Sequence, residues 1–263
     1  MKRKIIKLGQ ATLVTSLPSK WAQKHNLKQG DEIEIKEEGH KLILSSEKLK
    51  EHSSLTVDVS KLNPLVRKSL QALYIRGIDE LTLTTDTPSH IEKLGEFPLP
   101  HFLAYEIIEQ TKNKVIIKDF STEQMLNFDS VIRRVYLLIN NAFQELTDAL
   151  NNKETNLTFI ADADININKF SFLLQRTLYK KGYKEEYHTP AMYQIVTYLE
   201  DIGDTIKSLA IYTTENKMSY SPPTIEFIKS LQDIFREYQK LFFKFDNSLL
   251  SPSKVSFFIS NKE

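Results

Sequence analysis

The chemistry that this sequence offers is concentrated in two sets of side chains, one cationic and one acidic. The cationic set fills the first 28 residues, where no Asp or Glu precedes Asp31. Its members are Lys2, Arg3, Lys4, Lys7, Lys20, Lys24 and Lys28. The whole chain has 35 Lys and Arg against 34 Asp and Glu, so the remainder of the chain is acidic. A cationic segment on an acidic protein indicates an anionic partner, and nucleic acid is the first candidate.

The acidic set lies in the C-terminal half at helical spacing. Glu200 and Asp204 are four residues apart, and Asp164 and Asn168 have the same spacing. Residues at i and i+4 share one face of a helix, where like charges repel unless a cation neutralises them. Two facing helices that each present such an oxygen pair could hold a divalent or iron-type metal ion. We expect no other cofactor.

The same residues also have a structural interpretation. Lys207 follows Asp204 by three residues and could pair with it, and hydrogen bonds to neighbouring helices could satisfy Asp164 on its apolar stripe. Gly203 in mid-helix costs about 1 kcal/mol relative to Ala, which is explained if a helix or a ligand approaches closely. The sequence leaves the metal and the structural interpretations open.

Short strands separated by turns must position the cationic set. Strands are predicted at residues 4–8, 12–16, 32–36 and 41–45, with a short helix at 19–25 after Pro18. So few elements cannot bury a sufficient core alone. We therefore expect an interleaved homodimer, which would bring two sets of basic residues onto one face.

These residues resemble a known family. The blocks R-K-I-I-K-L-G, T-L-V-T-S-L-P-S-K-W and L-K-Q-G-D-E-I-E-I are similar to the SpoVT/AbrB and MazE family of swapped-hairpin DNA-binding domains. The resemblance implies a dimer that binds double-stranded DNA. Carried over by position, it assigns the contacts to Arg3, Lys4, Lys7, Thr12, Thr15 and Lys20. Phosphate contacts would supply affinity and salt dependence, whereas the alternative is a solvated basic surface.

A small α+β layer is predicted next, after a polar linker at residues 47–54. Its strands are residues 55–59, 80–85, 104–110 and 114–118, and its helices are residues 62–76 and 90–95. Gly77 is placed to end the first helix in a left-handed conformation. Both an effector-binding or dimerising role and a spacer role fit this layer.

From Ser121 the apolar period is that of long helices. Four helices joined by short turns predict an antiparallel bundle, with the later three near residues 154–181, 190–213 and after Ser221. On the last helix the predicted inward residues are Phe227, Leu231, Ile234, Tyr238, Leu241 and Phe245. The expected fold is α+β multidomain: an N-terminal swapped-hairpin β domain (1–46), a small α+β middle domain (55–118) and a C-terminal antiparallel helical bundle (121–250).

The bundle carries a second resemblance. The stretch E-D-I-G-D, from Glu200 to Asp204, is similar to the metal-binding motif of the PhoU family, whose helical bundles regulate phosphate uptake. The segment from Asp164 resembles that family's other motif, although Asp164 and Asn168 replace its usual glutamate and aspartate. The resemblance implies a metal ion held by these four residues. About one of the usual two three-helix repeats is present, and a homodimer could restore the second.

Together these features predict a transcriptional regulator of phosphate uptake or homeostasis, not an enzyme. The chain has no cysteine, no phosphate-binding loop and no H-E-x-x-H motif, and its six histidines are scattered. Alternative functions are a PhoU-like adaptor on a phosphate transporter or sensor kinase, and a MazE-type antitoxin. No apolar run approaches membrane-spanning length, so we expect no membrane insertion and a cytoplasmic protein.

Overall fold

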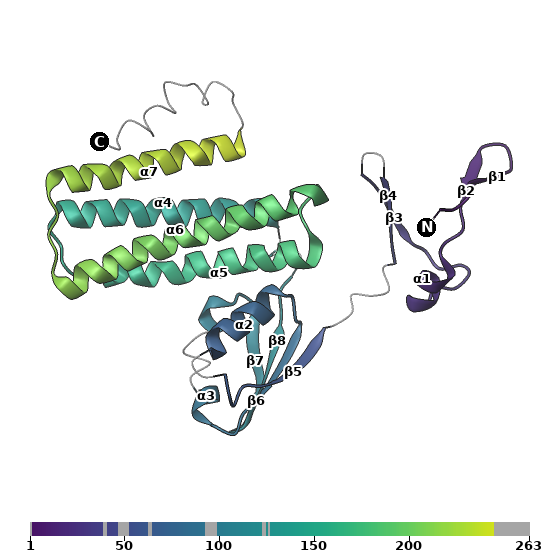
Figure 1. Cartoon of the computed structure of the whole chain (residues 1–263), viewed down its shortest axis with the longest axis horizontal. Helices are drawn as coiled ribbons and strands as arrows, with labels where there is room; N and C mark the ends of the chain where they lie inside the picture. Colours follow the sequence, from purple (N-terminus) through teal and green to yellow (C-terminus); the bar gives the residue numbers. More distant parts are fainter. Residues whose placement is uncertain are drawn as a thin grey trace. The chain divides into compact units, whose positions relative to one another are not determined.

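The computed structural model describes residues 2–38, 41–46, 53–62, 65–92, 99–122, 125 and 127–244. They belong to two compact units, Met1–Ser53 and Ser54–Glu263. Figure 1 shows hairpins and one short helix in the first unit, and a sheet followed by long helices in the second. The protein is therefore a mixed α+β protein with small N-terminal strands and a helical C-terminal region.

The N-terminal unit contains two antiparallel hairpins. β1 (Ile6–Leu8) pairs with β2 (Thr12–Val14), and β3 (Glu34–Glu38) pairs with β4 (Lys41–Ser45). Gly9 has φ +69°, a left-handed conformation that the tight first turn requires. α1 (Ser19–Lys24) follows Pro18 at its N-cap position. These elements confirm the predicted strands and helix, although β3 begins two residues later than expected and the second turn lies outside the described residues.

The described residues of this unit do not form a buried core. Each of its described side chains is at least partly exposed to solvent. Six apolar side chains each expose more than half of their surface: Ile5, Ile6, Leu8, Leu13, Ile35 and Leu42. A single copy of these hairpins therefore does not bury a hydrophobic core, as their small size led us to expect.

A four-stranded sheet opens the second unit. β5 (Ser54–Asp58), β6 (Glu80–Thr84), β8 (Lys114–Asp119) and β7 (Tyr105–Gln110) lie in this order, and only the β5–β6 pair is parallel. α2 (Val66–Ile75) connects β5 to β6, while α3 (Ser89–Glu92) and the short 3-10 helix η1 (Leu99–His101) precede β7. Gly77 follows α2 with φ +86° and confirms the predicted helix end.

The sheet buries one face because its apolar residues alternate along the strands. Leu81 pairs with Ile117 and Leu83 pairs with Val115, and all four side chains are fully buried. Paired residues share a face, so this register aligns the apolar sets of both strands. Tyr74 from α2 packs in the same cluster.

Four long helices complete the unit. They are α4 (Phe128–Asn151), α5 (Thr158–Lys181), α6 (Thr189–Asn216) and α7 (Pro222–Phe243). Figure 1 shows them side by side, with α4 packed on the other three and α5 on α6. α4 begins later than predicted because the Asn127 side chain caps it, accepting a 3.0 Å hydrogen bond from the Ser130 amide. No helix in the described part of the chain has the length and hydropathy needed to cross a membrane.

The predicted inward face of α7 is wrong for three residues, whereas Ile234 and Leu241 are partly buried. The buried residues of this helix are Ile225, Ile228, Gln232 and Phe235. Phe227, Leu231 and Tyr238, predicted to face inward, are 58 %, 38 % and 40 % exposed. α7 carries two apolar stripes, and the sequence pattern does not tell which one meets α4. Phe245, also predicted inward, lies outside the described residues.

α5 belongs to both parts of the second unit. Its stripe of Ile160, Asp164, Ile167, Ser171, Leu174 and Leu178 is buried in the bundle, and Asp164 lies on this apolar stripe as predicted. Its residue Phe172 instead joins the hydrophobic cluster of the sheet, where its ring lies 6.1 Å from that of Phe102. The sheet and the bundle are therefore packed together through α5.

Candidate functional site

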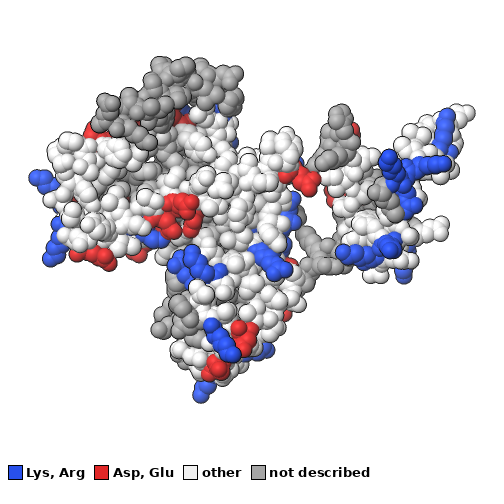
Figure 2. Space-filling view, in the orientation of Figure 1, with Lys and Arg blue, Asp and Glu red and all other residues white. Residues whose placement is uncertain are grey.

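The first candidate site is the cationic surface of the N-terminal unit. Arg3 and Lys4 precede β1, Lys7 lies within it, and Lys20 lies in α1. All four side chains are exposed, and so are those of Thr12 and Thr15. Figure 2 shows Lys and Arg side chains gathered over this unit. In the described part of the chain, none of these four cations forms an ion pair, so each is available to an anionic partner.

The β1–β2 hairpin does not bring all predicted contact residues onto one face. Lys7 pairs with Leu13, whereas Thr12 pairs with Leu8. Because partners in a ladder share a face and neighbours alternate, Lys7 and Thr12 project to opposite faces. The Thr15 hydroxyl donates a 3.5 Å hydrogen bond to the carbonyl oxygen of Lys4, which ties the two strands beside the cations. A duplex lying on the Lys7 face would thus meet Lys7 and not Thr12.

The second candidate site is a polar cluster between α5 and α6. The Asp164 carboxylate is buried and accepts hydrogen bonds from Asn168 Nδ2 at 2.6 Å and from Lys207 Nζ at 2.7 Å. The Lys207 ammonium also donates to Asp204 Oδ1 at 2.5 Å. A lysine therefore links the two carboxylates that the sequence places on facing helices. Sequence reasoning anticipated the Lys207–Asp204 pair but missed the Lys207–Asp164 pair.

Three ionisable side chains of this cluster have raised pKa values, and the causes differ from one residue to the next. Burial raises the pKa of Asp164, although the Lys207 hydrogen bond opposes the shift. Burial raises the pKa of Glu200 to about 7, with further contributions from the charges of Asp204, Asp201 and Asp164. For Lys207, burial acts to lower the pKa, but the hydrogen bonds to the two aspartates outweigh it and the pKa is raised. Lys207 thus stays protonated as the cation of the cluster.

As arranged here, these residues do not fit a metal ion. The Lys207 ammonium already occupies the position between the Asp164 and Asp204 oxygens. Within the described ranges, no group of three or more His, Cys, Asp or Glu side chains is placed to hold a metal. The metal site at Glu200, Asp204, Asp164 and Asn168 therefore stays a prediction from the sequence alone.

Sequence reasoning gave His101 no role, yet it lies near this cluster. His101 ends η1, is buried, and when protonated lowers the pKa of Asp164. No spacing in the sequence connects residue 101 with residue 164, because η1 meets α5 only in the folded chain. The contact between η1 and α5 is therefore seen in the structure but cannot be predicted from residue spacing in the sequence.

The N-terminal unit, which carries the cationic surface, is similar to a known protein family. Residues 6–52 match the family model for MazE, a bacterial antitoxin, described as antidote-toxin recognition. The match lies within the N-terminal unit and identifies a MazE/AbrB-like domain there, of the type found in DNA-binding regulators and antitoxins. No curated protein and no solved structure matches the chain. The family model thus agrees with the resemblance drawn from the strand and turn blocks.

Replacing Gly203 with Ala is expected to destabilise the protein by about 1–3 kcal/mol. An added Cβ would lie 2.8 Å from Ile167 Cγ2 and 3.3 Å from Asp164 Oδ1, so α5 and α6 would have to separate. That strain exceeds the gain of about 1 kcal/mol that Ala brings to a helix. Urea denaturation measures the change, with the exposed Ser208→Ala on the same helix as control. A Gly203→Ala protein as stable as the parent would show that the close approach carries no strain.

Glu200→Gln is expected to stabilise the protein at pH 8 but not at pH 4. The folded-state pKa of about 7 exceeds the ordinary value of 4.5, so between these values the folded chain retains a proton that the unfolded chain loses. The free energy of unfolding therefore falls as the pH rises from 4.5 to about 7. Gln does not ionise, so the substitution removes that loss. Solvent screening of this half-buried group limits the gain to about 1 kcal/mol. Denaturation at both pH values measures it, with exposed Glu215→Gln as control, and an equal effect at both pH values would contradict the shift.

Proposed function

We propose that the protein is a DNA-binding transcriptional regulator whose N-terminal unit contacts double-stranded DNA as a homodimer. The observation that carries the proposal is the exposed, acid-free set Arg3, Lys4, Lys7 and Lys20 on a unit matched by the MazE model. Unpaired surface cations neutralise phosphates and release counterions, which drives binding to a duplex.

The exposed apolar residues of the hairpins support the homodimer. Leu8 and Leu13 are 64 % and 66 % exposed, and Leu42 is 69 % exposed. Apolar surface on this scale in so small a unit is stabilised when a second copy covers it. Two copies would double the cations that one assembly presents to the phosphates of a duplex.

We propose that the second unit receives the signal that controls DNA binding. Its polar cluster between α5 and α6 resembles, in sequence, the motif of a family that regulates phosphate uptake, which is the basis for proposing phosphate-uptake genes as targets. A signal at the bundle can alter DNA binding only if it makes different contacts in two states of the protein. Proteins of the phosphate-transport or signalling machinery are the partners proposed for this unit.

An antitoxin is the second candidate, because the matched family model describes one. Proteins of the MazE type normally follow this domain with a short, poorly ordered tail. Here the chain continues into a compact unit, Ser54–Glu263, with a sheet and four long helices. That architecture favours a regulator with a folded input unit. The adaptor alternative, in which the N-terminal unit only dimerises, does not explain why these exposed cations form no ion pair with any described residue.

Genome-wide mapping of the DNA bound by the full-length protein, with phosphate replete and depleted, tests the proposal. We expect discrete sites at promoters of phosphate-transport genes, with occupancy that changes with phosphate supply. Sites confined to other promoters would overturn the phosphate assignment and leave DNA binding intact. Absence of any enriched site, together with no binding of purified protein to promoter fragments, would overturn the DNA-binding function itself.

A further inference from the structure

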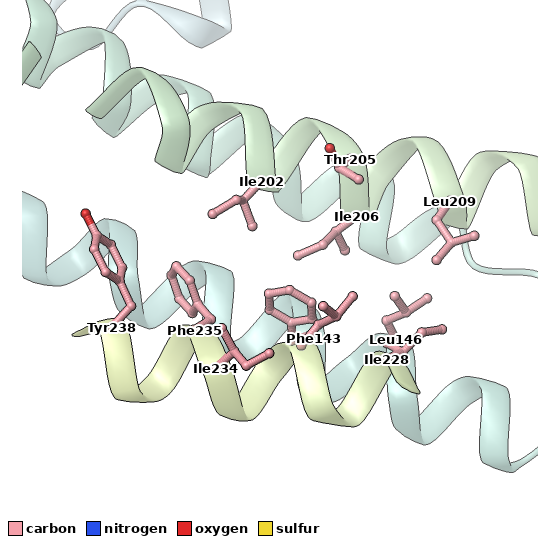
Figure 3. Close-up of a pocket in the computed structure, with 11 residues that line it drawn as sticks. Phe143, Leu146, Ile202, Thr205, Ile206, Leu209, Ile228, Ile234, Phe235 and Tyr238 are labelled. Carbon is pink, nitrogen blue, oxygen red and sulfur yellow. The ribbon is translucent and has the colours of Figure 1, made fainter. Parts of the chain in front are cut away.

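Two surfaces of the second unit are suited to a partner: a groove of the bundle and an edge of the sheet. The groove lies between α6 and α7, and Figure 3 shows Ile202 and Ile206 of α6 facing Phe235 of α7 across it. Its lining is apolar and uncharged, so it selects no particular partner. An edge strand is more specific, because its backbone groups and its side chains must both match those of the incoming strand.

The two edge strands of the sheet, β5 and β7, differ in how they present their backbone (Figure 1). β7 has a bulge between Ile107 and Glu109 and also carries Glu106. Bulges and charged side chains commonly protect an edge against pairing with another chain. β5 reads S-L-T-V-D, its ladder with β6 is continuous, and its only charged residue is Asp58 at the end. Of the two edges, β5 is therefore the one that is open to a further strand.

The outer side of β5 presents the backbone groups of every second residue. The Val59 amide donates a 2.8 Å hydrogen bond to the Thr84 carbonyl oxygen at the end of β6. In a parallel ladder the N–H and C=O of one residue point to the same side, and the side alternates along the strand. The backbone groups of Ser54, Thr56 and Asp58 therefore point away from β6. Among the described strands, none pairs with this side of β5.

A second copy of β5, running antiparallel to the first, matches this edge best in one register. That register sets Thr56 opposite Thr56 of the second copy, and Ser54 of each copy opposite Asp58 of the other. In an antiparallel ladder such residues exchange both of their N–H···O=C bonds, so the three pairs would form about six hydrogen bonds. Every other register pairs fewer of the outward-pointing residues.

The same register also matches the side chains of the two strands. Leu55 and Val57 are half-buried and pack against the hydrophobic cluster of the sheet. In the paired sheet, Leu55 of one copy lies opposite Val57 of the other, at the spacing of about 4.5 Å between Cα atoms that a non-hydrogen-bonded pair has. Asp58 lies opposite the uncharged Ser54, so no like charges meet across the pair. The partner strand would thus extend the apolar face of the sheet.

We propose that β5 pairs with β5 of a second copy about a two-fold axis at Thr56, which joins the two sheets into one. This inference rests on the homodimer of the proposed function, because one short strand makes a small interface and a tether raises the effective concentration of the second copy. The two chains would enter β5 about 14 Å apart, since the two Ser54 residues are separated by about four strand residues. The homodimer can exist without this pairing.

Single cysteine variants of the full-length protein test the pairing and its register, because the chain has no cysteine of its own. The two Thr56 Cα atoms would lie about 5.5 Å apart, within the range of about 4.4–6.8 Å that a disulfide spans. Ser54→Cys and Asp58→Cys are the matched controls, since both positions are exposed as Thr56 is, and each would lie about 14 Å from its copy. Mild oxidation of Thr56→Cys should give a product of twice the 30.5 kDa chain mass, at least tenfold more than either control gives.

Sedimentation of the unmodified full-length protein separates this inference from the proposed homodimer. If the protein sediments as a dimer and Thr56→Cys stays reduced, the pairing of β5 is overturned and the homodimer is kept. Equal cross-linking of all three variants would also overturn the pairing, because random collisions do not select a register. A monomer would overturn the homodimer of the proposed function together with the pairing.

A second measurement avoids cysteine substitutions. Thr56→Pro removes one outward-pointing N–H from each copy, at a kind of edge position where proline is tolerated. The ladder with β6 does not use this N–H, so it stays complete. The dissociation constant of the dimer, measured by sedimentation, should rise at least tenfold relative to Thr56→Val, which keeps the N–H. Equal dissociation constants for the two variants would overturn the pairing.

Discussion

Charge reversal of Arg3, Lys4 and Lys7 to Glu is expected to lower the affinity for double-stranded DNA by at least about 1,000-fold at 100 mM salt. The three side chains are exposed and free of ion pairs with described residues, so they contribute to the fold only weakly. In a homodimer the change removes six cations from the interface and adds six anions. Fluorescence anisotropy with a labelled promoter fragment measures the affinity.

The salt dependence of binding separates direct phosphate contact from an indirect effect. The logarithm of affinity falls with the logarithm of salt concentration by about 0.9 for each phosphate neutralised. Neutral Gln substitutions at the same three positions should therefore reduce this slope by up to about 5 for a dimer. A control with Lys112, Lys153 and Lys217 reversed to Glu changes the net charge equally on exposed residues of the second unit. If that control lost as much affinity, overall charge and not the proposed contact surface would explain binding.

Local sequence signals predicted the strands and the short helix of the N-terminal unit well, because these elements depend on neighbouring residues. Gly9 marks the first turn, Pro18 marks the start of the short helix, and alternating residues mark the strands. Each of these effects acts within a few residues. The face to which Thr12 points was harder to predict. It depends on the register of the hairpin, and a shift of one residue would exchange the faces.

Pairing between distant segments limited the prediction of the second unit. The stripe of α7 has correct helical spacing, yet Ile228 and Phe235 are buried in the bundle, whereas Leu231 and Tyr238 stay 38 % and 40 % exposed. Both stripes have the same period, so periodicity cannot rank them. In the polar cluster, the spacing of Asp204 and Lys207 predicted their pair, whereas the Lys207–Asp164 contact requires α6 to cross α5 at Gly203.

The sequence carried no signal for the contacts of Arg176. This residue is 1 % exposed, and its guanidinium reaches from α5 into the sheet layer. Its Nη2 donates to Asp119 Oδ2 at 2.5 Å and to the Ile78 carbonyl oxygen at 3.0 Å, and its Nη1 donates to the Tyr74 carbonyl oxygen. The guanidinium also lies over the rings of Tyr74 and Tyr105, at 4.9 Å and 5.2 Å from their centroids. This side chain thus joins the bundle to the sheet, in addition to Phe172 and Lys180 of the same helix.

Arg176→Met is expected to reduce the free energy of unfolding by about 3–5 kcal/mol. Met fills much of the volume but leaves the Asp119 carboxylate, whose side chain is 6 % exposed, without its counterion. Two carbonyl oxygens lose their donor as well. Chemical denaturation followed by circular dichroism measures the loss.

Two comparisons identify the unpaired charge as the cause. Lys180→Met removes an ion pair with Asp79 one turn further along α5, but the Lys180 side chain is one third exposed, so the loss should stay below about 1 kcal/mol. Adding Asp119→Asn to Arg176→Met removes the buried negative charge and should restore part of the stability. An Arg176→Met protein that loses no more than Lys180→Met, or that gains nothing from Asp119→Asn, would show that this contact does not hold the two layers together.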